Sequence, residues 1–251
     1  MGPIKTEAVV LRSMRYGEAD RILHLYTPEN GRMSAIAKGS RRPNSRFGGR
    51  LEPFFRLRVD LHEGRSELLT VTGAQTVAGY PRLRTHARAL DAAARACDAV
   101  GRLFETSEGH PGVFNLLCNA LSLLDREPAH ASPARALAFR LKLLVAAGLT
   151  PRLSACVACG KETDLTRFTG QGGGMLCESC YSQAMPGEPA RTGSFPLGGD
   201  AMRFMAESLS HTLAEAPEAR ATALRQVERA IGETVEHHAH VRLMAASNGR
   251  A

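Results

Sequence analysis

The sequence RILHLYTPENGRMSAIAKG (residues 21–39) decides how the first part of this chain folds. It predicts two strands, RILHLYT and RMSAIAKG, joined by the short sequence PENG. Asn30 and Gly31 form a dipeptide that is typical of tight hairpins, because both residue types tolerate a positive φ. The stretch therefore predicts a β-hairpin inside a β-rich segment.

The sequences on either side of this hairpin predict three more strands. IKTEAVVL (residues 4–11) gives the first strand, FFRLRVDLHEG (54–64) the fourth and SELLTVTGAQTV (66–77) the fifth, with a turn at residues 63–65. Apolar and charged residues alternate along the fourth strand, which is typical of a strand with one face in a core. Five short strands within residues 1–80 favour a small closed barrel, which leaves no exposed sheet edge. A five-stranded sandwich is the alternative.

The pattern becomes helical after the predicted barrel. Residues 83–124 are rich in Ala and Leu, and their apolar residues recur at spacings of three and four. The sequence GHPG (109–112) separates two helices within this segment. Ser132 followed by Pro133 is an N-cap with proline at the first helical position, which predicts a largely apolar, buried helix over residues 134–148.

Two closing helices are expected near the C-terminus, over residues 201–213 and 223–245. Their apolar faces need partners, so we expect them to pack against the helices that precede the cysteine-rich segment. The prediction is an α+β, multidomain fold. Its domains are a barrel (1–80), a first helical part (81–152), a zinc-ribbon-like insertion (153–186) and a closing helical part (187–251).

The sequence CVACGKETDLTRFTGQGGGMLCESC contains two Cys-x-x-Cys pairs, Cys156 with Cys159 and Cys177 with Cys180. Two intervening residues let a tight turn direct both sulfurs at one point, and four soft ligands suit Zn²⁺. Four cysteines fill every tetrahedral position and leave none for water or substrate, so we predict a structural zinc. The alternatives are an iron site, a redox pair, or a knuckle that has lost its metal.

The other candidate ligands are expected to be structural. Cys97 and Cys118 lie in apolar helical sequence, where small core residues are common. His237, His238 and His240 are spaced so that they fall on different faces of one helix. The chain contains no His-x-Glu, Walker-type loop or Gly-x-Ser-x-Gly, so we expect it not to be an enzyme.

The overall charge indicates the class of partner. The chain of 251 residues carries a formal charge of +7, and a basic surface attracts polyanions such as nucleic acid. It lacks an apolar run of the ~18 residues that a membrane span needs, and it lacks a signal-peptide pattern at its N-terminus. Six cysteines without a secretion signal favour the reducing cytoplasm.

The positive charge is concentrated in the sequence AKGSRRPNSRFGGRLEPF (residues 37–54). We predict that this stretch is a loop between two barrel strands that contacts the phosphates of DNA, with Phe47 able to stack on a base. The alternative is an ordinary solvated basic loop. Contact through phosphates predicts little sequence preference and a steep dependence on salt. The predicted contact residues are Lys38, Arg41, Arg42, Arg46 and Arg50, extended by Arg12 and Arg15 at the end of the first strand.

Two long strings carry a resemblance that runs almost from end to end. They are EAVVLRSMRYGEADRILHLYTPENGRMSAIAKGSRRPNSRFGGRLEPF (residues 7–54) and FRLKLLVAAGLTPRLSACVACG (139–160). On these strings the chain resembles RecO, a family of bacterial DNA repair proteins that act as recombination mediators. The resemblance implies an OB-fold barrel followed by a helical domain with an inserted zinc module. It also carries DNA contact to Lys38, Arg41 and Arg42, which match the basic string of the family.

The resemblance further implies a set of partners. RecO-like proteins bind single- and double-stranded DNA and anneal complementary strands. They act with RecR, often with RecF, to load RecA onto strands coated by single-stranded-DNA-binding protein (SSB), and some hold the SSB C-terminal tail. We therefore expect a non-enzymatic mediator in the cytoplasm, associated with the nucleoid. The alternatives are an RNA-binding or transcription-associated protein that combines a zinc ribbon with an OB fold and, disfavoured by the closed ligand set, a zinc hydrolase or deaminase.

Overall fold

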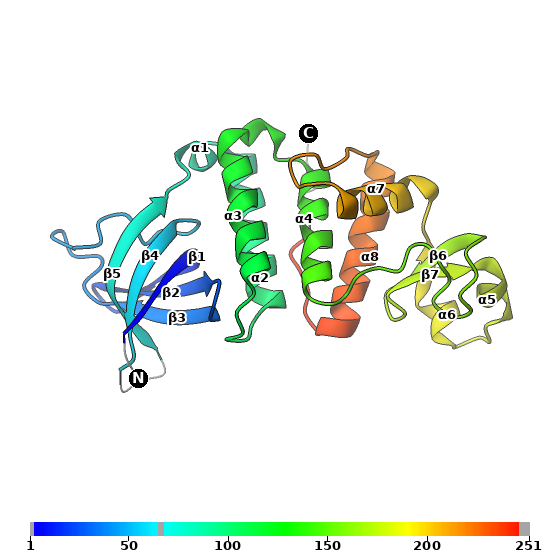
Figure 1. Ribbon diagram of the computed structural model, residues 1–251, viewed down its shortest axis with the longest axis horizontal. Helices are drawn as coiled ribbons and strands as arrows, with labels where there is room; N and C mark the ends of the chain where they lie inside the picture. The colour runs from blue at the N-terminus through cyan, green and yellow to red at the C-terminus, as the bar shows by residue number, and fades with distance from the viewer. Residues whose placement is uncertain (1–2, 65–67, 246–251) are drawn as a thin grey trace. The chain divides into compact units, whose positions relative to one another are not determined.

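The computed structural model describes residues 3–64 and 68–245 (Figure 1). The chain forms two compact units, residues 1–131 and 132–251, which are described separately. The domain boundaries expected from the sequence remain predictions. Residues 65–67, which include the end of one expected turn and the start of the fifth expected strand, lie outside the described residues. Among the described residues, no helix has both the length and the apolar character needed to cross a membrane.

The first unit begins with a closed barrel of five strands in the order β1-β2-β3-β5-β4 (Figure 1). Neighbouring strands are antiparallel except β3 and β5, which run parallel. This closed arrangement confirms the predicted OB-type barrel and excludes the sandwich. The strands are β1 (Ile4–Tyr16), β2 (Asp20–Thr27), β3 (Gly31–Ala37), β4 (Arg56–His62) and β5 (Leu69–Ala78).

The predicted hairpin is present between β2 and β3, with a connection one residue longer than a two-residue turn. Thr27 pairs with Gly31 across the hairpin, and Gly31 alone of the expected Asn-Gly pair has a positive φ, 55°. Glycine is also required there for space, because a Cβ atom at Gly31 would lie 2.4 Å from the carbonyl oxygen of Glu108. The hairpin tip therefore fits closely against the loop that precedes helix α3 (Pro111–Arg126).

The barrel core forms where the alternating pattern predicts it. Leu57, Val59 and Leu61 of β4 are fully buried, whereas the residues between them are at least partly exposed. Each such side chain contributes roughly 1.5–3 kcal/mol through removal from water. Two residues from outside the strands, Phe47 and Leu51, belong to the same core.

Helices complete the first unit. Helices α2 and α3 pack against each other and contact β1 and β2, respectively. Cys97 and Cys118 are buried on these helices, as expected for core residues. The elements are α1 (Pro81–Arg84), α2 (Ala87–Leu103), α3 (Pro111–Arg126) and the 3₁₀ turn η1 (Pro128–His130).

Among its described residues, the second unit combines five helices with a small sheet of order β7-β6-β8. As predicted, the Ser132 hydroxyl caps α4 by accepting a hydrogen bond from the Arg135 N–H at 3.2 Å. The closing helices α7 and α8 pack against α4, as expected for helices with apolar faces. The elements are α4 (Pro133–Ala146), β6 (Leu165–Thr169), β7 (Gly174–Cys177), α5 (Glu178–Gln183), α6 (Pro189–Thr192), β8 (Ser194–Pro196), α7 (Gly199–Ser210) and α8 (Ala221–Ala239).

The last helix is shorter than the sequence predicts. We expected a helix through residue 245, but α8 ends at Ala239 because His240 adopts a left-handed conformation with φ 55°. The chain beyond it is held by Arg140, a buried residue of α4 that donates a hydrogen bond to the Met244 carbonyl. Arg140 also lies 3.6 Å from the Glu228 carboxylate of α8, so it fixes both the helix and the segment that follows.

Candidate nucleic-acid interface and metal centre

The loop predicted over residues 37–54 corresponds to residues 38–55, which connect β3 to β4 and form consecutive turns. Backbone hydrogen bonds close these turns, for example from the Ser45 N–H to the Arg42 carbonyl at 3.0 Å. Phe47 and Leu51 insert into the barrel core and anchor the loop to the barrel. The loop backbone is therefore held in place, and conformational freedom remains mainly in the long cationic side chains.

The start of the loop is attached to the turn between β1 and β2. The Gly39 N–H donates to an Asp20 carboxylate oxygen at 2.7 Å, and the Arg41 N–H donates to the Ala19 carbonyl at 2.8 Å. The Arg41 guanidinium also donates to the Gly17 carbonyl at 3.3 Å. These bonds place the loop cations beside the end of β1, where the sequence predicted that the basic surface continues.

The cations predicted to contact DNA are all exposed, and we call them together the cationic surface. Within residues 3–64 and 68–245, none of them lies in an ion pair with a carboxylate. They are Lys38, Arg41, Arg42, Arg46 and Arg50 of the loop, with Arg12 and Arg15 of β1.

Other barrel arginines differ from the cationic surface because they are neutralised. Arg21 pairs with Glu52 at 2.8 Å, and Arg56 pairs with Glu7 at 2.6 Å. The acidic residue Glu18 lies exposed in the β1–β2 turn. The unpaired charge of this part of the barrel is thus predominantly positive, as contact with a polyanion requires.

The prediction that Phe47 stacks on a base is wrong. Its side chain is only 1% exposed and lies in the barrel core, and the Arg46 guanidinium lies 5.0 Å from the centre of its ring. A base cannot reach the ring without unfolding this end of the barrel. Phe47 instead positions the neighbouring arginines.

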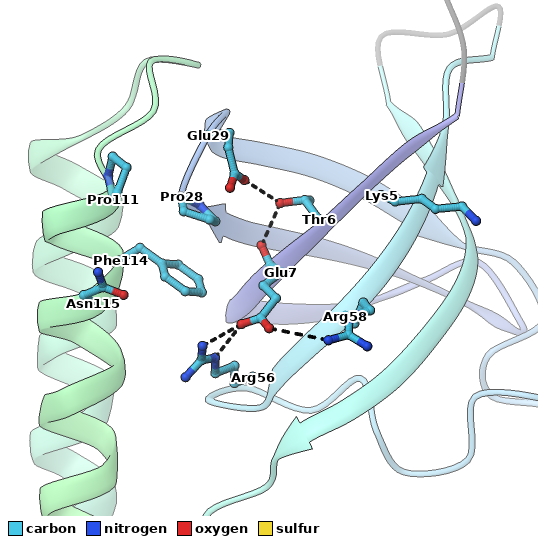
Figure 2. A pocket seen from close by; sticks show the side chains of 10 residues that line it. All are labelled: Lys5, Thr6, Glu7, Pro28, Glu29, Arg56, Arg58, Pro111, Phe114 and Asn115. Atoms are coloured by element: carbon cyan, nitrogen blue, oxygen red, sulfur yellow. Dashed lines mark hydrogen bonds and ion pairs between the residues drawn. The ribbon is translucent and has the colours of Figure 1, made fainter.

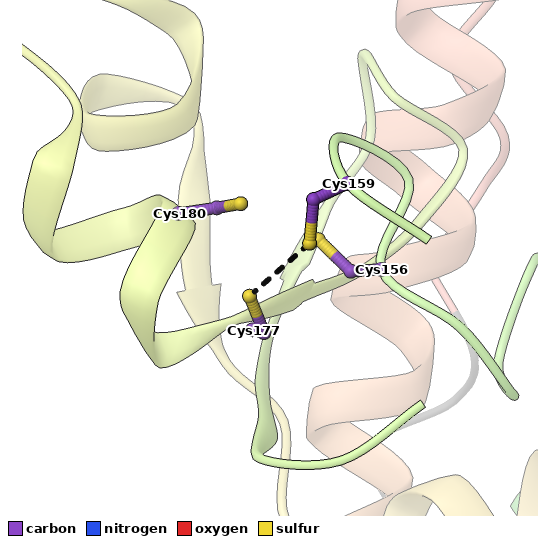
Figure 3. A group of neighbouring side chains, drawn as sticks. All are labelled: Cys156, Cys159, Cys177 and Cys180. Carbon is purple, nitrogen blue, oxygen red and sulfur yellow. Dashed lines mark hydrogen bonds between the residues drawn. The ribbon is translucent and has the colours of Figure 1, made fainter. Parts of the chain in front are cut away.

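The four cysteines of the predicted zinc site converge in the second unit, as Figure 3 shows. All four sulfurs lie within 4.8 Å of one another, and those of Cys159 and Cys177 are 3.7 Å apart. Four sulfurs placed ~2.3 Å from a central zinc ion would be separated by about 3.8 Å. The cluster, which is completed by Cys156 and Cys180, can therefore hold a tetrahedral metal ion.

The electrostatics of this cluster favour a thiolate at Cys156 and a protonated thiol at Cys180. Burial opposes ionisation of Cys156, but backbone N–H groups of Cys177, Cys159 and Ala158 outweigh it and lower its pKa to about 6. Hydrogen bonding to the thiols of Cys159 and Cys177 raises the pKa of Cys180 to about 12. Cys156 thus favours the thiolate form, whereas Cys180 favours the protonated thiol. Metal binding would then release a proton from Cys180, as expected for thiol ligands.

The remaining candidate ligands do not form a second metal site among the described residues. His238 Nε2 lies 3.0 Å from the Gly170 carbonyl oxygen, which gives it a structural contact. His237 and His240 line a shared hollow beside Gly170, so they do not fall on separate faces as the sequence predicted. Burial raises the pKa values of Cys97 and Cys118, the latter to about 11, so both thiols are poor ligands and nucleophiles.

A cavity of about 600 Å³ lies in the first unit between β1, β4 and the start of α3 (Figure 2). Its charged groups largely satisfy one another, since Glu7 pairs with Arg56 and lies 3.9 Å from Arg58. The Thr6 hydroxyl donates to the Glu29 carboxylate at 2.9 Å. This internal pairing distinguishes the cavity from the cationic surface.

Comparison with known proteins identifies the family. The model described as "Recombination protein O N terminal" matches residues 1–80, and "Recombination protein O C terminal" matches residues 84–244. This chain belongs to the RecO family. It is 40% identical over 236 residues to the DNA repair protein RecO of Rubrobacter xylanophilus, covering 92% of this chain and 91% of the relative. It is 36% identical over 250 residues to the DNA repair protein RecO of Anaeromyxobacter dehalogenans, covering 98% and 95%.

The string GEADR (residues 17–21) contains the β1–β2 turn and Asp20, which hold the loop in place. Sequence reasoning used this string only as a mark of resemblance and missed its structural role. The available signal was its position at a strand end, where a short acidic side chain commonly accepts backbone N–H groups.

Proposed function

We propose that this chain is a DNA-binding recombination mediator in DNA repair that acts without covalent chemistry. The observation that carries the proposal is the cationic surface, in which seven exposed cations without carboxylate partners among the described residues gather at one end of an OB barrel. Membership of the RecO family supports the role in repair and recombination.

The proposed activity is the binding of single- and double-stranded DNA and the annealing of complementary strands. Annealing requires only that the repulsion between two phosphate backbones be reduced, and cations that displace counterions do this. An anchored loop suits the task, since less backbone entropy is lost when the strand binds. Binding through phosphates gives little preference for sequence.

The partners proposed from the family are RecR, possibly with RecF, the RecA recombinase, and SSB through its acidic C-terminal tail. With RecR, the chain would promote RecA loading on SSB-coated single strands. The proposed place of action is the cytoplasm, beside the nucleoid. Family membership supports these partners, and their contact residues are left unassigned.

The proposed metal is a structural Zn²⁺ held by Cys156, Cys159, Cys177 and Cys180. The donor set supports zinc because four thiolates are its typical structural ligands. The buried residues next to the sulfurs are Cys156, Leu176 and Cys177, so two of the metal ligands are themselves part of this small core. The ion would stabilise the fold of this segment and leave no position for a reacting water.

The test is a strand-annealing assay over a range of salt concentrations, with and without RecR. We expect annealing of bare complementary DNA that weakens steeply with salt, and a changed activity on SSB-coated strands when RecR is present. Tight, sequence-specific binding of a duplex or of RNA, without annealing, would support the alternative of a zinc-ribbon RNA-binding or transcription-associated protein.

A further inference from the structure

With Phe47 buried, an exposed aromatic side chain is found instead on the outer face of the barrel. Strand residues alternate between two faces. Leu23 and Leu25 of β2 face the core, so Ile22 and His24 face outward. The outward residues pair across β1, β2 and β3 in the rows Arg12–His24–Ser34 and Met14–Ile22–Ile36, followed by the pair Tyr16–Asp20.

Tyr16 is the exposed aromatic residue of this face. Its side chain is 53% exposed, although it is the last residue of β1 and its backbone pairs with Asp20. The row before it, formed by Met14, Ile22 and Ile36, is half-buried and apolar. The face thus offers one projecting ring beside a shallow apolar strip.

Positive charge lies close to this ring. Arg41 donates to the carbonyl of Gly17, the residue after Tyr16, whereas Arg15 directly precedes Tyr16 and therefore lies on the other face of the strand. Arg12 lies four residues back on the same face, about 13 Å away along the strand. The acidic neighbour Asp20 is engaged by the Gly39 N–H at 2.7 Å. A phosphate backbone held by Arg41 and Arg12 would therefore pass over Tyr16.

We propose that Tyr16 is the residue on which a base of bound single-stranded DNA stacks, with the outer face of β1, β2 and β3 as the path of the strand. The proposal rests on the DNA-binding function proposed above and adds a contact to the base. Aromatic side chains next to cations are how single-strand-binding barrels hold bases without regard to sequence. Tyr16 takes the role that the sequence assigned to Phe47.

The experiment compares a short oligothymidylate with a strand of the same length that lacks bases. We expect Tyr16→Ala to lower affinity for the oligothymidylate about tenfold, within the range for loss of one stacked base, and to leave the abasic strand unchanged. Tyr16→Phe keeps the ring and should bind both strands as the unchanged protein does. Val77→Ala, at a 44% exposed position of β5, controls for loss of a surface apolar group.

A second readout uses the absence of tryptophan from the chain. In Tyr16→Trp the introduced indole is the sole tryptophan, so its fluorescence reports stacking directly. We expect quenching by oligothymidylate, and little change with the abasic strand or with heparin.

The outcomes separate this inference from the function on which it rests. An affinity for oligothymidylate unchanged by Tyr16→Ala, or an equal loss on both strands, overturns the stacking role. If Arg41→Ala with Arg42→Ala weakens binding to both strands in that case, the proposed function stands without the inference. Failure of the unchanged protein to bind either strand at low salt overturns both. Loss of RecR binding instead of DNA binding in Tyr16→Ala would make the face a protein-docking surface and also overturn the inference.

Discussion

The backbone N–H of Arg41 donates a hydrogen bond to the Ala19 carbonyl at 2.8 Å, which ties the basic loop to the turn between β1 and β2. A second bond joins the same segments, from the Gly39 N–H to the Asp20 carboxylate. The loop is fastened at this edge and by Phe47 in the core. Its cations therefore project from an ordered backbone instead of from a free chain.

Replacement of Asp20 separates its structural role from its charge. Asp20→Ala removes the acceptor of the Gly39 N–H, and we expect the free energy of unfolding to fall by about 1–2 kcal/mol. Asp20→Asn removes the same charge but keeps an oxygen acceptor. DNA affinity should therefore be lower in Asp20→Ala than in Asp20→Asn, measured by titration of labelled strands. Equal affinities in the two variants would mean that Asp20 acts by charge alone.

Replacement of Phe47 tests whether this ring anchors the loop. Phe47→Ala leaves a cavity in the barrel core and should cost about 3–5 kcal/mol in urea unfolding. Phe47→Leu retains an apolar anchor, so its stability should fall less and its DNA affinity should stay near that of the unchanged protein. A stable Phe47→Leu variant with a tenfold loss of DNA affinity would instead indicate direct contact with a base.

Replacement of the clustered cysteines tests the metal centre. Cys156→Ser or Cys177→Ser removes one of four ligands, and we expect loss of bound zinc and a lower melting temperature of the second unit. Metal analysis of the purified protein, together with thermal unfolding, measures both effects. Cys97→Ala is the matched control, because the Cys97 thiol is buried outside the cluster. The metal content of this variant should equal that of the unchanged protein. Unaltered stability in metal-free Cys156→Ser would show that the ion does not support the fold.

The buried thiols of the first unit predict a loss of stability in alkali. Burial raises the pKa of Cys118 to about 11 and raises that of Cys97 further, so the folded chain keeps protons that the unfolded chain releases near pH 8.5–9. The contribution of these two thiols to the free energy of unfolding is fully present below that pH. It is lost as pH rises, by at most about 1.4 kcal/mol per pH unit for each thiol. Urea unfolding between pH 7.5 and 10.5 measures the slope. Cys118→Ala should flatten it, and an identical slope in that variant would exclude this thiol as a cause.

Sequence reasoning succeeded where a local pattern determines the structure. The alternation along β4 predicts which side of the strand enters the core, and the two Cys-x-x-Cys pairs predict a convergent cluster. Both features depend on residues close together in the sequence, through strand periodicity and short turns. Sequence patterns alone were therefore sufficient to predict them.

The failures have a common physical cause, because each depends on contacts between distant residues. Phe47 lies in a Gly- and Arg-rich loop, and nothing nearby indicates that its ring enters the barrel. The helical pattern continues beyond Ala239, yet Arg140, a hundred residues earlier, binds the Met244 carbonyl.

The central claim is that the cationic surface holds DNA through its phosphates, and the salt dependence of binding tests it most directly. Seven phosphate contacts predict a slope of about −5 for log affinity against log salt on single strands, and Arg41→Ala with Arg42→Ala should reduce its magnitude by about 1.4. Arg88→Ala with Arg126→Ala removes equal charge from exposed helix positions of the same unit and should leave the slope unchanged. Equal slopes in the unchanged protein and in the Arg41/Arg42 variant, at undiminished affinity, would contradict the account.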